Sequence, residues 1–206
     1  MVQTSSPQAD IKAELAGPSP DGKAVAELFD SLAIGDAIAA ARTLSGTRTQ
    51  RALWNAAETQ TPIATEDLIA PDYAPMKPVV FHGKNSLPAF SEFRKICCRP
   101  DSGSAAGTLW GFNDTTIEPL IGPGYYVVHD TTGNELGGTA FDYRELPTDR
   151  IADWPVIRPN TYRLSRFVYN GTVDYMRRVA RDVFIGTATR NDKELGSYFI
   201  LVREMT

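Results

Sequence analysis

The sequence has no apolar run long enough to cross a bilayer, and its first residues lack the basic-then-apolar order of a signal peptide. We therefore expect a cytoplasmic protein with no membrane partner. A basic excess is also lacking, since 25 Asp and Glu residues outnumber 21 Lys and Arg residues and leave a formal net charge of −4. Because nucleic-acid binding needs a concentrated basic surface, this balance predicts no nucleic-acid partner.

Cysteine, histidine and the common cofactor motifs are scarce. The two cysteines, Cys97 and Cys98, are adjacent, and because vicinal disulfides are strained they indicate free, buried thiols rather than a disulfide framework. The sequence has only two histidines, and it contains no glycine-rich phosphate loop, no zinc-spaced Cys/His set and no nucleophile elbow. We therefore expect no cofactor and no metal site.

The composition changes along the 206 residues in a way that divides the chain into four segments. Residues 1–22 are rich in Ser, Pro, Gly and Ala and predict a flexible leader. Residues 23–58 carry apolar residues at helical spacing and predict an N-terminal helical segment, either a hairpin or one kinked helix. The proline-rich residues 59–78 predict a connector, and residues 79–206 predict a β-barrel ligand-binding domain.

Short β-branched and aromatic runs, separated by turn residues, dominate the chain after residue 79. The turns TTGNELGG and TRNDKELGS are typical of hairpins, and a helical turn is expected over residues 87–98. Eight antiparallel strands with few helices leave a sandwich or a closed barrel as alternatives. The strands are expected at about 79–82, 106–112, 125–130, 137–143, 161–169, 172–179, 182–190 and 197–204.

The stretch TYRLSRFVYNG, residues 161–171, favours the barrel. As a strand it would place Arg163, Phe167 and Tyr169 on one face and Arg166 on the other, so that each face carries an arginine among apolar groups. A sandwich packs dry inner faces, whereas a barrel of about eight strands can enclose a ligand and line it with mixed groups. We therefore expect the face of Arg163 to line a partly polar cavity.

The C-terminal third resembles a known family through short motifs. The segments RLSRFVYNGTV, DYMRRVARDVFIGTATR and SYFILVRE are similar to the domain of unknown function that commonly follows a GXWXG domain, and LWGFNDTTIEPLIG and FDYRELP resemble its middle section. The Gly-x-Trp-x-Gly signature itself is absent from the sequence. The resemblance implies a mainly β protein, a lipocalin-like antiparallel β-barrel of about eight strands with an N-terminal helical segment, and it defines no activity.

Residues that could do chemistry are few. A histidine near the mouth of a cavity can act in acid–base catalysis, and a strand carboxylate such as Asp142 or Asp174 can face inward if an arginine pairs with it. The candidate catalytic residues are His82, His129, Asp142 and Arg163. Aromatic side chains suit a largely apolar ligand, and the candidate substrate-binding residues are Trp110, Tyr126, Phe167 and Tyr169. Each of these groups has a plain alternative as a rim residue, an internal ion pair or core filler.

Three functions fit this inventory. The first is a cofactor-independent isomerase or cyclase acting on a hydrophobic natural-product intermediate, because such a reaction needs a shaped pocket and hydrogen-bond donors that polarise a carbonyl. The second is a non-catalytic carrier of a lipid-like or aromatic molecule. The third is an interaction module whose barrel is filled by its own side chains. The expected partner is a hydrophobic small molecule, and a homodimer is a further expectation.

Overall fold

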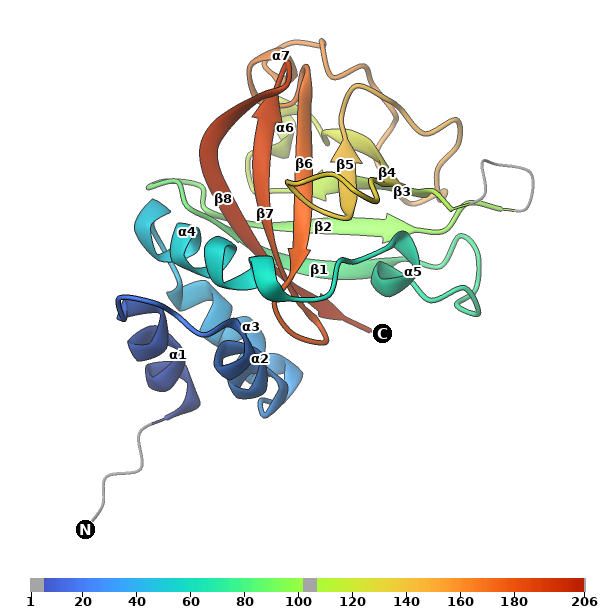
Figure 1. The fold of residues 1–206 in the computed structure, drawn as a ribbon. Helices are drawn as coiled ribbons and strands as arrows, with labels where there is room; N and C mark the ends of the chain where they lie inside the picture. The colour runs from blue at the N-terminus through green and yellow to red at the C-terminus, as the bar shows by residue number, and fades with distance from the viewer. Residues whose placement is uncertain (1–5, 102–106, 206) are drawn as a thin grey trace.

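The computed structural model describes residues 6–101 and 107–205, and its centre is a closed β-barrel (Figure 1). Eight strands follow one another around the barrel in chain order, each antiparallel to the next, and the last pairs with the first. The expected closed antiparallel barrel is therefore confirmed. The strands are β1 (Val79–Asn85), β2 (Glu92–Cys98), β3 (Leu109–Asp114), β4 (Tyr125–Asp130), β5 (Thr139–Asp142), β6 (Thr172–Arg178), β7 (Val183–Arg190) and β8 (Lys193–Glu204).

In the described residues six helical elements precede the barrel, and two short helices interrupt its connections. The first helix lies inside the segment expected to be a flexible leader: Ser6 caps it and it buries Ile11 and Leu15. That expectation is corrected for residues 7–16, and residues 1–5 lie outside the described part. The helices are α1 (Pro7–Ala16), α2 (Gly22–Asp30), α3 (Ile34–Thr43), α4 (Thr47–Ala56), the 3-10 turn η1 (Ala57–Thr59), α5 (Thr65–Leu68), α6 (Glu118–Ile121) and α7 (Ser165–Val168).

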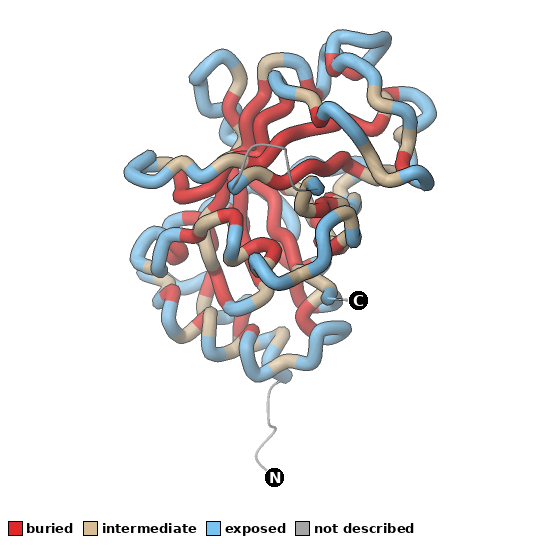
Figure 2. The backbone as a smooth tube through the Cα atoms, turned by 90° about the vertical axis from the view of Figure 1, so that its right-hand side faces the viewer, coloured by how far each residue is buried: buried red, intermediate tan, exposed pale blue. Residues whose placement is uncertain are grey.

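The four N-terminal helices cover the outside of the barrel wall where β7, β8 and β1 meet (Figure 1). Their apolar side chains, such as Phe29 and Leu53, share one core with the outward side chains Ile185 and Ile200. At the edge of this layer the guanidinium of Arg177 stacks 4.1 Å from the ring centre of Trp54. Figure 2 shows the result, with buried strands at the centre and exposed connections around them.

Two sequence predictions about single elements are wrong. Residues 161–169 do not form a strand but a turn followed by α7, and Arg163 has a positive φ of 48° that no extended strand contains. The expected helical turn over residues 87–98 is instead the hairpin to β2 and β2 itself, which pairs with β1 on one side and β3 on the other. The expected strand 106–112 is β3, and residue 106 lies outside the described part.

Aromatic rings packed over glycines fill much of the barrel interior. A side chain at Gly186 would place its first carbon 2.2 Å from the ring of Phe199, and Gly83 and Gly111 face Phe93 and Tyr126 with similar closeness. Because these glycines lack a side chain, each ring can lie over the neighbouring strand, directly across from the glycine that pairs with it. The interior is therefore a packed aromatic core rather than a wide open cavity.

The connections β1–β2, β3–β4, β5–β6 and β7–β8 all lie at one end of the barrel, because the strands alternate in direction. We call this the upper end; α6 and α7 lie there, at the top of Figure 1. The opposite end carries α5. None of the described helices is both long enough and apolar enough to cross a membrane.

Candidate active site

Lys95 lies inside the barrel and is only 1% exposed. It points inward because it alternates along β2 with Arg94 and Ile96, which face outward, while Phe93 and Cys97 share its face. Lysine is almost never fully buried unless it is paired, so this position marks the interior as chemically unusual.

Three acceptors surround the ammonium group of Lys95. It donates to Asp174 Oδ2 at 3.0 Å, to Asn113 Oδ1 at 3.2 Å and to the hydroxyl of Tyr143. The Tyr143 hydroxyl in turn lies 3.1 Å from Asp174 Oδ2, to which it can donate. These four residues, from β2, β3, β6 and the position directly after β5, are called the Lys95 cluster below.

An aromatic cage encloses the same ammonium group. Five ring centres lie between 4.8 and 5.9 Å from Lys95 Nζ. The electron-rich faces of such rings attract a cation, and the attraction is strongest where water is excluded. The rings are Phe93, Tyr126, Phe141, Tyr143 and Phe199.

Burial shifts the acidity of the groups around Lys95. Burial lowers the pKa of Lys95 below 10.5, and the nearby carboxylate of Asp174 opposes that shift. Burial also raises the pKa of Tyr143 well above 10, as does the Asp174 charge, and burial raises that of Tyr126. The two phenols therefore stay protonated near neutral pH and act as hydrogen-bond donors.

The Lys95 cluster lies in the upper half of the barrel. Asp174 and Asn113 are near the upper ends of their strands, and the Asp174 side chain is 11% exposed. Ala188, which faces Asp174 across the β6–β7 pair, is only partly buried. Asp174 is therefore the most exposed member of the Lys95 cluster.

The four predicted catalytic residues lie outside this interior. His82 is on the outer face of β1 with its Nε2 2.7 Å from Glu204 Oε2, and His129 is on the outer face of β4. Asp142 also faces outward and is held by the guanidinium of Arg144. Arg163 is exposed in the β5–β6 connection, so the expectation that it faces a cavity is wrong.

Two of the four predicted lining residues lie inside the barrel and two lie outside it. Tyr126 faces inward as part of the cage, and Tyr169 also lies inside, stacked on Tyr143 at 5.3 Å between ring centres. Trp110 faces outward in an apolar cluster covered by the segment around Trp154. Phe167 is 64% exposed on α7.

Sequence reasoning missed Lys95 because the surrounding letters FRKICC were interpreted as part of a helical turn. Read as a strand, the same letters place Phe93, Lys95 and Cys97 on one face, which is a usable signal. The expectation that an inward strand carboxylate needs a cationic partner applies to Asp174, although its partner is a lysine rather than an arginine.

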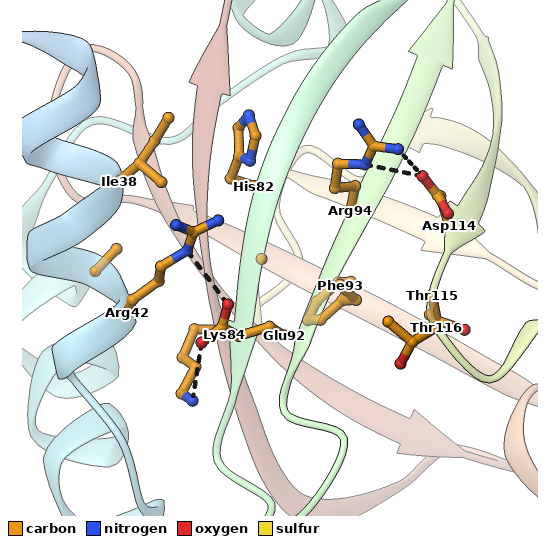
Figure 3. Close-up of a pocket in the computed structure, with 12 residues that line it drawn as sticks. Ile38, Arg42, His82, Lys84, Glu92, Phe93, Arg94, Asp114, Thr115 and Thr116 are labelled. Carbon is orange, nitrogen blue, oxygen red and sulfur yellow. Dashed lines mark hydrogen bonds and ion pairs between the residues drawn. The ribbon is translucent and has the colours of Figure 1, made fainter.

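A groove of about 350 Å³ lies between α3 and the strands β1, β2 and β3, and its lining includes the cage ring Phe93 and Gly83 as well as outward side chains. Figure 3 shows Arg42 and Lys84 converging on Glu92, at 3.4 and 3.8 Å, while Arg94 pairs with Asp114. Its charges are therefore largely satisfied among themselves. Within residues 6–101 and 107–205, no group of three or more His, Cys, Asp or Glu side chains could hold a metal ion.

No family model, curated protein or solved structure matches this chain.

Proposed function

We propose that the protein is a cofactor-independent enzyme, an isomerase or cyclase, that acts on a hydrophobic small molecule at the Lys95 cluster. The observation that carries the proposal is the buried pair of Lys95 and Asp174, joined to the Tyr143 hydroxyl inside an aromatic cage. Strongly perturbed ionisable groups enclosed by apolar walls are typical of active sites. The resemblance to the GXWXG-associated domain stays a prediction and supplies no residue to the proposal.

The cluster supplies the two functions that such a reaction needs. Lys95 and Tyr143 donate hydrogen bonds from one side, so they would stabilise negative charge on a substrate carbonyl oxygen. Asp174 is the acceptor beside them, and it would take a proton from the carbon next to that carbonyl and return it at another carbon. Protons and electrons balance, since one proton leaves the substrate and one returns.

Substrate access requires movement of the cage at the upper end. Phe93 is the only partly buried ring of the cage, and it meets Phe199 edge to face at 6.0 Å between ring centres. A flat apolar substrate could replace the contacts of the Phe93 ring with its own, because aromatic surfaces pack interchangeably in this way.

The aromatic side chains of the interior also support a second candidate, the non-catalytic carrier, whereas the close packing of those side chains favours the interaction module. An aromatic cage with few donors would hold a planar apolar ligand without changing it. If nothing enters the barrel, both small-molecule functions fail and the interaction module is left.

Native mass spectrometry of the purified protein, followed by extraction of any bound compound, tests the proposal. The variants Lys95→Met, Asp174→Asn and Tyr143→Phe are compared with Lys84→Met, a matched lysine change on the outer face of β1. An enzyme predicts that the first three retain ligand while turnover falls at least about a hundredfold, the usual contribution of an acid–base group. A carrier predicts a bound compound that the wild-type protein never converts.

One result would contradict both the enzyme and the carrier. It is a wild-type protein that carries no compound and does not enhance the fluorescence of an apolar probe such as cis-parinaric acid. Circular dichroism of each variant separates loss of function from loss of fold.

A further inference from the structure

Exposed apolar side chains gather at the upper end of the barrel. Leu87 and Phe90 lie in the β1–β2 hairpin, Leu120 on α6, Phe167 on α7 and Leu195 at the start of β8. Each is between 47% and 68% exposed. Large exposed apolar side chains that lie together on a molecule are typical of interaction surfaces, and these five all lie in or beside the connections at this end.

A basic segment runs through the same end. Arg158, Arg163 and Arg166 are exposed there, and no acidic residue lies between Asp153 and Asp174 in the sequence. This local excess contrasts with the negative charge of the whole chain, −4. Segment 154–173 therefore carries a net positive charge, although the whole chain is negatively charged.

The arginines are interleaved with exposed aromatic rings. The guanidinium groups of Arg158 and Arg163 lie 4.9 and 5.1 Å from the ring centre of Tyr162, and that of Arg166 lies 5.0 Å from the ring of Phe167. Tyr and Trp rings beside basic groups are typical of protein surfaces that lie at the headgroup level of a membrane.

The exposure of Phe167 is built into the local structure. Arg190, at the upper end of β7, donates to the carbonyl oxygens of Phe167 and Val168 at 3.0 and 2.9 Å. The next ring, Tyr169, is buried against Tyr143 and anchors the segment from the inside. With α7 held at both points, the Phe167 ring projects into solvent.

We propose that the upper end of the barrel docks onto a membrane surface containing anionic phospholipid, with α7 at its centre. Exposed Phe167, Leu164 and Leu120 would enter the headgroup boundary, and the arginines of segment 154–173 would face the lipid phosphates. Charge complementarity selects this occupant, because three exposed arginines without an acidic neighbour in the segment fit an anionic leaflet. A protein partner or a second copy of the chain is an alternative outcome of the test below.

Acidic groups also lie at this end, among them Glu118 on α6 and Glu194 on β8, so the positive charge is local to segment 154–173. Asp114 is paired with Arg94, and Asp192 lies 3.9 Å from Arg144, so each has a basic partner. The expectation of no membrane partner was based on the lack of a spanning run. Binding at a surface does not need one.

Co-sedimentation with vesicles tests the proposal without any knowledge of the substrate, so it stands or fails independently of the proposed function. Full-length protein is mixed with vesicles of phosphatidylcholine alone and of phosphatidylcholine with phosphatidylglycerol. We expect binding to the anionic vesicles, weakening as salt is raised, and little binding to the neutral ones.

Two double variants and a matched control locate the surface. Phe167→Ser with Leu120→Ser, and Arg163→Gln with Arg166→Gln, should each weaken vesicle binding about tenfold or more. The control, Ile34→Ser with Arg48→Gln, removes an exposed apolar residue and an arginine from the helical layer and should bind like wild type. Circular dichroism confirms that all three fold.

Three outcomes would overturn the proposal. They are no binding to anionic vesicles, equal losses in the control, and a wild-type dimer that Phe167→Ser with Leu120→Ser converts to a monomer in light scattering. The last would show that a second copy of the chain covers the upper end.

Discussion

The ammonium nitrogen of Lys95 lies 3.0 Å from a carboxylate oxygen of Asp174 inside the barrel, although 79 positions separate the two residues in the sequence. Each makes the burial of the other tolerable, because an unpaired charge in an apolar interior costs several kcal/mol. The pair joins β2 to β6 across the barrel, so the interior is linked by a charge contact as well as by apolar packing.

Removal of the Asp174 charge should destabilise the protein strongly. Asp174→Asn leaves the fully buried Lys95 without its counter-charge, and the expected loss is about 3–5 kcal/mol in the free energy of unfolding measured in urea. Lys95→Met with Asp174→Asn removes both charges and should recover a large part of that loss. A single variant within about 1 kcal/mol of wild type would show that the pair contributes little.

The stability of the protein should depend on pH through Lys95. Burial lowers the pKa of Lys95 in the folded protein below its ordinary value of 10.5. Between the folded-state pKa and 10.5, Lys95 is therefore protonated more often in the unfolded chain than in the folded protein. The free energy of unfolding that Lys95 contributes therefore rises as pH rises through that window. The difference between wild type and Lys95→Met, measured by urea denaturation from neutral pH to pH 10, should rise in the same direction. A flat difference would contradict this linkage.

Because aromatic rings pack directly over glycines, adding one methyl group at such a glycine should lower the stability of the protein. Gly186→Ala would place its new carbon 2.2 Å from the Phe199 ring and 2.7 Å from the Met176 sulfur, and the expected loss is about 1–3 kcal/mol. Gly35→Ala is the matched control, because nothing lies within 4 Å of the new carbon and the site is helical. It should leave stability unchanged or raise it by up to about 1 kcal/mol. Thermal unfolding of both variants measures the two changes in stability. Equal changes would show that the Phe199 ring and its neighbours shift to accept the added methyl group at little cost.

The two cysteines should be inert in the folded protein. Both are buried, and burial raises the pKa of Cys97 and of Cys98 to about 12, so almost no thiolate is present at pH 8. Ellman's reagent should therefore react slowly with native protein and rapidly with both thiols in guanidinium chloride. Fast reaction of the native protein would mean that the wall at β2 opens readily.

The turn letters and the short β-branched runs predicted antiparallel strands with helices before them, but the choice of a barrel over a sandwich was argued mainly from segment 161–171, which is not a strand. The burial of β1 agrees with such strands, because buried and partly buried positions alternate along most of it. Segment 161–169 failed for the opposite reason. Its aromatic and β-branched letters predict a strand, yet the closing strands pair without it and it folds as a turn and α7.

The candidate site depended on information that alternation does not carry. Period two places Lys95 on the face of Phe93 and Cys97, but it does not say which face is the interior, and a one-residue change of register exchanges the faces. Only closure of the barrel decided that His82 and His129 face outward and that Lys95 faces Asp174. The sequence by itself determined the class of fold and the absence of cofactor motifs. The tertiary structure decided where charge is buried, because pairing a buried charge requires a partner from a distant strand.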